Sequence, residues 1–183
     1  MKKIVLTFGL IAGFIFSAII FSTLALCLSG KMKWEQSEII GYTTMVLAFS
    51  MVFFGIRSYR ENSGGTITFL RGVKVGLLIT LVACAVYVIS WEIVYFGFTP
   101  EFYDEYSAHM LEKMRADGKP EAQIEAERKK MADFKPLYDN PLINSAVTFV
   151  EAFPVGLVVT LVSAAILRKK ALPPAGRAAA AMA

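Results

Sequence analysis

The sequence is poor in charged residues, in histidine and in cysteine. Asp, Glu, Lys and Arg make up only 19% of its 183 residues, and His109 is the one histidine. The two cysteines, Cys27 and Cys84, lie in apolar segments without the spacing of redox or zinc sites. Phosphate-binding glycine loops, nucleophile elbows and calcium loops are also missing. We therefore expect no catalytic residue, metal or cofactor, and no enzyme.

The chain has instead long apolar blocks. Hydrophobic residues make up 56% of it, and its mean hydropathy is +0.54. A soluble domain of this size could not bury so many apolar residues in its core. The blocks run over residues 4–28, 39–56, 72–98 and 142–167. Since about 20 apolar residues cross a bilayer, we expect an all-α protein, a four-helix transmembrane bundle forming a single membrane domain over residues 1–170. Residues 171–183, rich in alanine, are expected to be a disordered tail.

Residues 99–141 hold most of the acidic residues. Thr99 and Pro100 predict the start of one helix, Gly118 its end, Pro120 the start of a second helix and Pro136 its end. We expect an extramembrane helical hairpin, although the charge of the segment alone would also suit a disordered linker.

Basic residues near the block ends set the expected orientation. Most of them fall on one side of four spans, where Glu61 is the one acid: Lys2, Lys3, Arg57, Arg60, Arg71, Lys74 and Arg168. The positive-inside rule then predicts a bacterial inner-membrane protein with both termini in the cytoplasm and the hairpin in the periplasm. The net charge of +4 is assigned to lipid contacts rather than to nucleic acid.

Several short stretches resemble a bacterial family of uncharacterised four-span membrane proteins, a domain of unknown function typical of Bacteroidetes-like bacteria. The stretches are residues 41–44, 53–62, 91–96, 139–144 and 153–157, including Trp91-Glu92-Ile93-Val94-Tyr95-Phe96 and Phe153-Pro154-Val155-Gly156-Leu157. The resemblance covers residues 1–170 and implies the topology, but no activity.

Glu151 is the most informative polar residue. It lies about 15 Å along the last block at 1.5 Å per residue, near the middle of a hydrocarbon layer of about 30 Å. Pro154 opens the helix beside it, and Gly156 permits close approach or bending. An acid, a proline and a glycine so close together indicate an intramembrane polar site, as in transporters. The alternative is a structural hydrogen bond from Glu151 to a neighbouring helix.

Glu92 lies in the same half of the membrane as Glu151. If the third and fourth spans are neighbours, the two acids could share a proton, with Asn144 and Tyr95 adding hydrogen bonds. The alternative places Glu92 in the headgroup region beside Trp91. At the other end, the residues Arg57, Arg60, Arg71 and Lys74 form a basic rim, expected to bind lipid phosphate; the alternative is a specific anionic ligand.

Three functions follow, in order of preference. The first is an accessory or partner-binding membrane protein, whose expected contacts are the lipid bilayer and either further copies of itself or another membrane protein. The second is a small proton- or ion-coupled transporter or channel that uses Glu151 and Glu92. An intramembrane enzyme ranks last, because no nucleophile or metal set accompanies the two acids.

Overall fold

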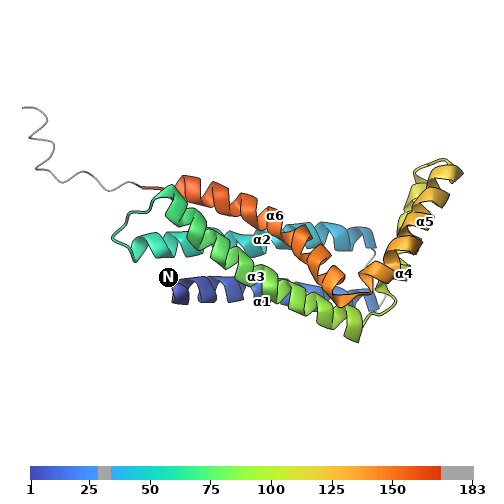
Figure 1. Cartoon of the computed structure of the whole chain (residues 1–183), viewed down its shortest axis with the longest axis horizontal. Helices are drawn as coiled ribbons and strands as arrows, with labels where there is room; N and C mark the ends of the chain where they lie inside the picture. Colours follow the sequence, from blue (N-terminus) through green and yellow to red (C-terminus); the bar gives the residue numbers. More distant parts are fainter. Residues whose placement is uncertain (29–33, 170–183) are drawn as a thin grey trace, which may run out of the picture.

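A computed structural model describes residues 1–28 and 34–169, and six α-helices make up this part of the chain (Figure 1). Their bounds are α1 Lys2–Leu28, α2 Trp34–Glu61, α3 Phe69–Gly97, α4 Phe102–Ala116, α5 Glu121–Tyr138 and α6 Pro141–Leu167. The described residues contain no strand beyond one isolated bridge, so the prediction of an all-α fold is confirmed. The predicted tail at 171–183 lies outside the described residues.

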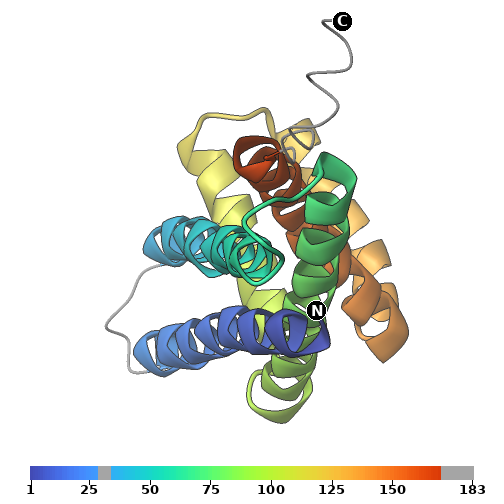
Figure 2. The same ribbon diagram turned by 90° about the vertical axis from the view of Figure 1, so that its left-hand side faces the viewer.

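The four long helices pack side by side along most of their length (Figures 1 and 2). Each of them contacts two neighbours in the order α1, α2, α6 and α3, and α2 also contacts α3. Buried apolar side chains from all four helices fill the space between them, including Phe16, Phe49, Ile79 and Ala152. Large apolar side chains also cover the outside, among them Phe14, Ile89 and Val158.

Three of the described helices are long and apolar enough to cross a membrane: Lys2–Thr23 within α1, all of α3 and all of α6. This is consistent with a membrane protein, but four such helices were expected. The stretch 39–56 lies in α2, which does not qualify over its described residues. Some side chains near the start of this stretch are not among those that the structure describes. Arg57, Arg60 and Glu61 add charge at the C-terminal end of α2.

Small residues bring α3 and α6 close together. On α3, Gly72 and Gly76 face α6: an added methyl group would lie 3.1 Å from Ala164 Cβ at Gly72 and 2.7 Å from Thr160 Cγ2 at Gly76. Gly156 of α6 lies against α3 in the same way. Because these residues recur every four positions on two antiparallel helices, the two backbones approach without bulky side chains between them.

Local chemistry fixes the ends of the helices. Thr68 Oγ1 accepts a hydrogen bond from Arg71 N at 3.3 Å at the start of α3. Asn140 caps α6 through its Oδ1, which accepts from Leu142 N at 3.0 Å. Gly118, at φ +70°, ends α4 as predicted: its N–H bonds Arg115 O, and the next N–H bonds Met114 O.

Two predicted helix ends are wrong. Thr99 does not begin α4, which starts at Phe102; the Thr99 backbone N–H and its hydroxyl instead both bond Val94 O and finish α3. Pro136 does not end α5, which continues to Tyr138. A proline in the last turn removes one backbone hydrogen bond, and α5 nevertheless continues to Tyr138, whose ring packs against Tyr95 and Tyr103.

At the opposite end of the structure, the turn before α3 is joined to the end of α6. Gly64 and Gly65, both at φ +76°, reverse the chain after α2. Ile67 and Lys169 then exchange two backbone hydrogen bonds of 3.0 Å. The N-terminus of α1 lies at this same end, away from α4 and α5 (Figure 1).

Candidate functional site

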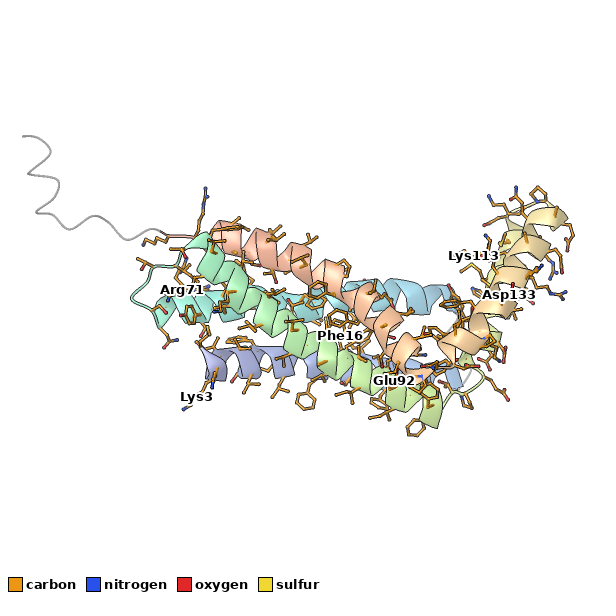
Figure 3. The ribbon with its side chains drawn as sticks, viewed as in Figure 1. Lys3, Phe16, Arg71, Glu92, Lys113 and Asp133 are labelled. Carbon is orange, nitrogen blue, oxygen red and sulfur yellow. The ribbon has the colours of Figure 1, made fainter. Side chains whose placement is uncertain are left out.

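Glu92 of α3 lies at the end of the long helices that is nearest to α4 and α5 (Figure 3). Its Oε1 accepts a hydrogen bond of 2.9 Å from Ser145 Oγ of α6, and its side chain is partly buried. Asn144, beside Ser145, is fully buried. Neighbouring α3 and α6 therefore bring Glu92 to the start of α6, where its hydrogen-bond partner is Ser145 and not the predicted Glu151.

Asn144 has one satisfied and one unsatisfied polar atom. Its Nδ2 donates to Tyr138 O at 3.2 Å, which joins α6 to the end of α5. Its Oδ1 is buried and has no hydrogen-bond partner within the described part of the chain. A buried amide oxygen without a partner has lost its hydration, so Asn144 has unused capacity to accept a hydrogen bond.

Tyr95 of α3 and Asp139, which follows the last residue of α5, are joined by a hydrogen bond. Tyr95 is 1% exposed, and its hydroxyl donates to Asp139 Oδ1 at 2.6 Å. The sequence predicts for Tyr95 only a hydrogen bond near Glu92 and Glu151, and it does not predict the pairing with Asp139. The two residues lie more than forty positions apart in the sequence, and Asp139 reaches Tyr95 because it stands just before α6, which packs on α3.

Aromatic rings surround this contact and connect α3 to the hairpin. The Tyr95 ring lies 5.2 Å from that of Tyr138, which lies 5.2 Å from that of Tyr103. The ring centroids of Trp91 and Phe102 lie 4.9 Å apart. Each pair adds attraction beyond the burial of its area, so the foot of the hairpin is held by a continuous set of rings.

The electrostatic surroundings of Tyr138 link it to both acids. Burial raises the pKa of the Tyr138 hydroxyl to about 12, and the negative charges of Glu151 and Glu92 act in the same direction. Tyr138 therefore stays neutral at physiological pH. Sequence reasoning missed this residue, because nothing in its neighbourhood along the chain marks it as close to two acids of other helices.

Glu151 makes no hydrogen bond to this cluster within the described part of the chain, although its charge reaches Tyr138. Its side chain is exposed on the outer surface of α6, as is Pro154 one turn further on. Tyr87 and Tyr138 are within range of its charge, but the described residues show no hydrogen bond to it. Glu92 and Glu151 therefore face different surroundings, with Glu92 between α3 and α6 and Glu151 on the outer face.

Gly156 serves packing in this structure. It is buried, and an added methyl group would lie 2.7 Å from Phe49 Cε1 and would overlap Thr80 Cγ2. Thr80 Oγ1 lies 3.1 Å from Thr160 Oγ1 and 3.5 Å from Gly156 O. The five predicted residues are thus divided: Glu92 and Asn144 near the hairpin, Glu151 and Pro154 outside, and Gly156 inside.

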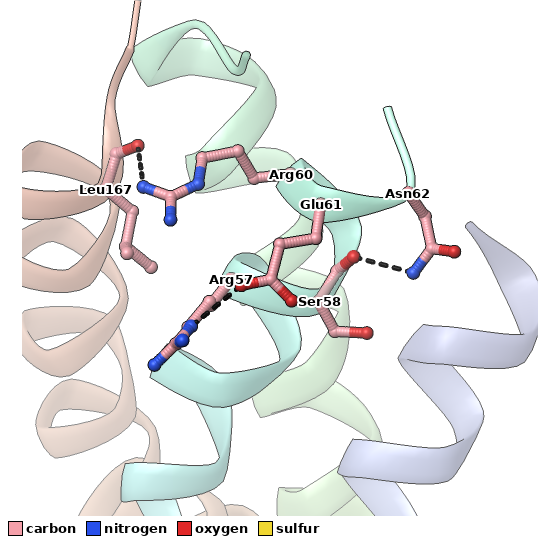
Figure 4. Close-up of polar contacts among 6 residues, drawn as sticks. All are labelled: Arg57, Ser58, Arg60, Glu61, Asn62 and Leu167. Carbon is pink, nitrogen blue, oxygen red and sulfur yellow. Dashed lines mark hydrogen bonds and ion pairs between the residues drawn. The ribbon is translucent and has the colours of Figure 1, made fainter. Parts of the chain in front are cut away.

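The basic rim lies at the opposite end, with Arg71 in Figure 3 and Arg57 and Arg60 in Figure 4. Arg57 Nε donates to Glu61 Oε1 at 2.9 Å, and Arg60 Nη1 donates to Leu167 O at 3.4 Å. Arg71 and Lys74 are exposed. The rim therefore has two arginines engaged within the protein and two cations directed outward.

The described residues contain no group of three His, Cys, Asp or Glu side chains placed to hold a metal ion. The profile of the family described as "Protein of unknown function (DUF4199)" matches residues 7–169. No curated protein and no solved structure matches the chain.

Proposed function

The chain belongs to this DUF4199 family, and we propose that it is an inner-membrane accessory protein that holds the hairpin of α4 and α5 at the membrane surface to bind a partner protein. One observation carries the proposal. The hairpin is fixed to the long helices by the hydrogen bond between Tyr95 and Asp139, at 2.6 Å, instead of being connected through a flexible linker. A polar surface held in one orientation is suited to binding.

We assign α2 as a fourth transmembrane helix. Residues 39–56 of α2 carry no charge, and α2 runs beside α1 and α6 within the same group of helices (Figure 2). With α2 as a span, the long helices form a four-helix transmembrane bundle. The apolar side chains on its outside, such as Phe14 and Val158, then face hydrocarbon.

The orientation follows from the distribution of charge. The N-terminus, the turn between α2 and α3 and the end of α6 share one end of the structure (Figure 1). That end carries the exposed cations Arg71 and Lys74, so we assign it to the cytoplasm, where lipid phosphates bind them. The hairpin, at the other end, then lies in the periplasm.

The hairpin offers a surface that is mostly charged with a small apolar part. Lys135 and Asp104 form an ion pair between its two helices, and Tyr103 OH donates to Met131 O at 3.2 Å. Phe134 and Leu137 remain exposed near its foot. Apolar residues within a polar surface are the usual composition of a transient protein interface.

Site-specific photo-crosslinking in intact cells tests the proposal. A photoreactive residue at Leu137 is expected to give one reproducible adduct with another protein, whereas the same residue at Leu70, at the opposite end, is expected to give no such adduct. Absence of an adduct from Leu137 and Phe134 would refute partner binding by the hairpin. Release of the protein from membranes by alkaline carbonate would refute the membrane location.

A further inference from the structure

The helices α1 and α3 touch at two glycines of α1 and diverge toward the end that we assign to the cytoplasm. An added methyl group at Gly9 would lie 2.6 Å from Val82 Cβ. One at Gly13 would lie 2.5 Å from Val86 Cβ. The N-terminal ends of the two helices lie further apart than these contact points (Figures 1 and 2). The contact between α1 and α3 is therefore tight at the glycines and looser at the cytoplasmic end.

A groove of about 310 Å³ lies between the two helices at this end, and its lining is entirely apolar. The lining comes from the start of the chain and from one residue of α3: Met1, Lys2, Val5, Leu6 and Leu78. Since Met1 and Leu6 are half exposed, the groove opens to the outer surface. Its volume is at the lower limit of small-molecule sites, about 300–1,000 Å³, and suits a segment of an alkyl chain. We call it the Leu78 groove.

Both helices carry cations beside the Leu78 groove. Lys2 lines it with the alkyl part of its side chain, so its ammonium group is directed away from the apolar lining. On α3, the exposed Lys74 and Arg71 precede Leu78 by one and two turns on the same face. Within residues 1–28 and 34–169 none of these cations forms an ion pair, and Glu61, the one acid at this end, forms its ion pair within α2. The positive charge beside the groove is therefore not neutralised by the described residues.

We propose that the Leu78 groove binds one anionic phospholipid of the cytoplasmic leaflet, with part of an acyl chain between α1 and α3 and the phosphate against Lys2 and Lys74. The inference rests on the proposed membrane location and adds a defined lipid site to it. Leu78 lies about 6 Å deeper than Lys74 at 1.5 Å per residue, so the chain and the phosphate fall at the depths that one lipid spans.

The dimensions and charge of the Leu78 groove favour a lipid over a partner helix. Along α1 its lining ends at Leu6, because the two helices are in contact from Gly9 onward. A groove of fewer than two turns is too short for a transmembrane helix to pack along, whereas it accommodates part of one alkyl chain. Basic pockets between transmembrane helices on the cytoplasmic side bind anionic head groups, which explains cations on both sides of the groove.

The first test measures lipid binding to the purified protein in a neutral detergent by native mass spectrometry. One phosphatidylglycerol is expected to bind more tightly than phosphatidylcholine with the same acyl chains. Lys74→Gln is expected to raise the dissociation constant for phosphatidylglycerol about fivefold, the usual effect of one cation on an anionic lipid. Lys169→Gln removes an exposed cation from the same end but outside the groove, and is expected to leave the constant unchanged. Equal constants for the two lipids, or equal effects of the two substitutions, would overturn the proposal.

The second test locates the acyl chain in phosphatidylcholine vesicles that contain phosphatidylglycerol with a photoreactive group on one chain. Adducts are expected at Leu6 and Leu78 in preference to Phe14 and Val158, which are exposed apolar residues outside the groove. Equal labelling of all four residues would show general contact with lipid and overturn the proposal. A protein that alkaline carbonate releases from membranes refutes the membrane location as well. A protein that stays in the membrane without preferring phosphatidylglycerol refutes the lipid site alone.

Discussion

Thr80 of α3 and Gly156 of α6 are in direct contact at the crossing of their helices, where the Thr80 hydroxyl donates to Gly156 O at 3.5 Å. The contact requires the absence of a side chain on Gly156, because the Phe49 ring also lies against it. Close approach of the two helices therefore depends on a glycine, a threonine and an aromatic ring that come from three different helices.

Gly156→Ala is expected to destabilise the fold by about 1–3 kcal/mol, since overpacking forces neighbouring groups to move. Thermal unfolding in detergent, followed by circular dichroism, measures the effect. Gly41→Ala is the matched control, because a methyl group there meets no described atom within 4 Å. Equal melting temperatures for the two variants would contradict the packing role of Gly156.

Tyr95→Phe is expected to loosen the hairpin without unfolding the long helices. The substitution keeps the ring and removes the hydroxyl that donates to Asp139, a hydrogen bond to a charged group worth about 1.5–3 kcal/mol. Hydrogen exchange is expected to become faster in α4 and α5 and to stay constant in α1. Tyr103→Phe, which removes a bond within the hairpin, serves as the comparison; unchanged exchange in Tyr95→Phe would refute the anchoring role.

Tyr138 predicts a loss of stability in alkaline solution. A tyrosine titrates near pH 10 in an unfolded chain, whereas burial raises the pKa of Tyr138 to about 12 in the fold. Between these two values the unfolded state loses its proton first. The stabilisation is therefore complete below pH 10 and is lost as the pH rises to 12, by about 3 kcal/mol at about 1.4 kcal/mol per pH unit.

Unfolding in detergent at several pH values from 9 to 12 checks this prediction. The free energy of unfolding of the wild-type protein is expected to fall more steeply with pH than that of Tyr138→Phe. Other tyrosines contribute equally to both proteins, so the difference between the two slopes reports Tyr138. Parallel slopes would show that its hydroxyl is not buried in solution.

Labelling with a membrane-impermeant maleimide decides whether α2 is a span. In a variant with Cys27 and Cys84 replaced by alanine, Lys119→Cys at the tip of the hairpin is expected to react in intact spheroplasts. Ser63→Cys, between α2 and α3, is expected to react only after permeabilisation. With three spans and the same cytoplasmic N-terminus, the two sites would exchange their behaviour, so the reverse result would refute a transmembrane α2.

Glu151→Gln is expected to leave proton flux into proteoliposomes unchanged, as is the matched variant Glu92→Gln. A transporter would need both acids on one internal path, whereas Glu151 lies on the outer face and Glu92 accepts a hydrogen bond from Ser145. A loss of flux in Glu151→Gln, with normal flux in Glu92→Gln, would support transport at Glu151 and contradict the accessory role.

Sequence patterns were informative where the cause is local. Apolar blocks predicted helices, and Gly118 predicted the end of α4, because each effect depends on residues close together in the sequence. The polar contacts between helices could not be predicted from the sequence. The pairing of Tyr95 with Asp139 depends on how the hairpin folds back, and the outward direction of Glu151 depends on how α6 is rotated about its axis. Spacing along one chain does not determine that rotation when every face of the helix is apolar.

The close packing of α3 on α6 has a mechanical consequence. At Gly72, Gly76 and Gly156 the two backbones are in close contact, so sliding of one helix along the other would bring bulkier residues into the contact. The hairpin is attached at one end of this helix pair, and the paired backbones of Ile67 and Lys169 lie at the other. We therefore expect a tilt of the hairpin to be carried along α3 and α6 together and not along one of them alone.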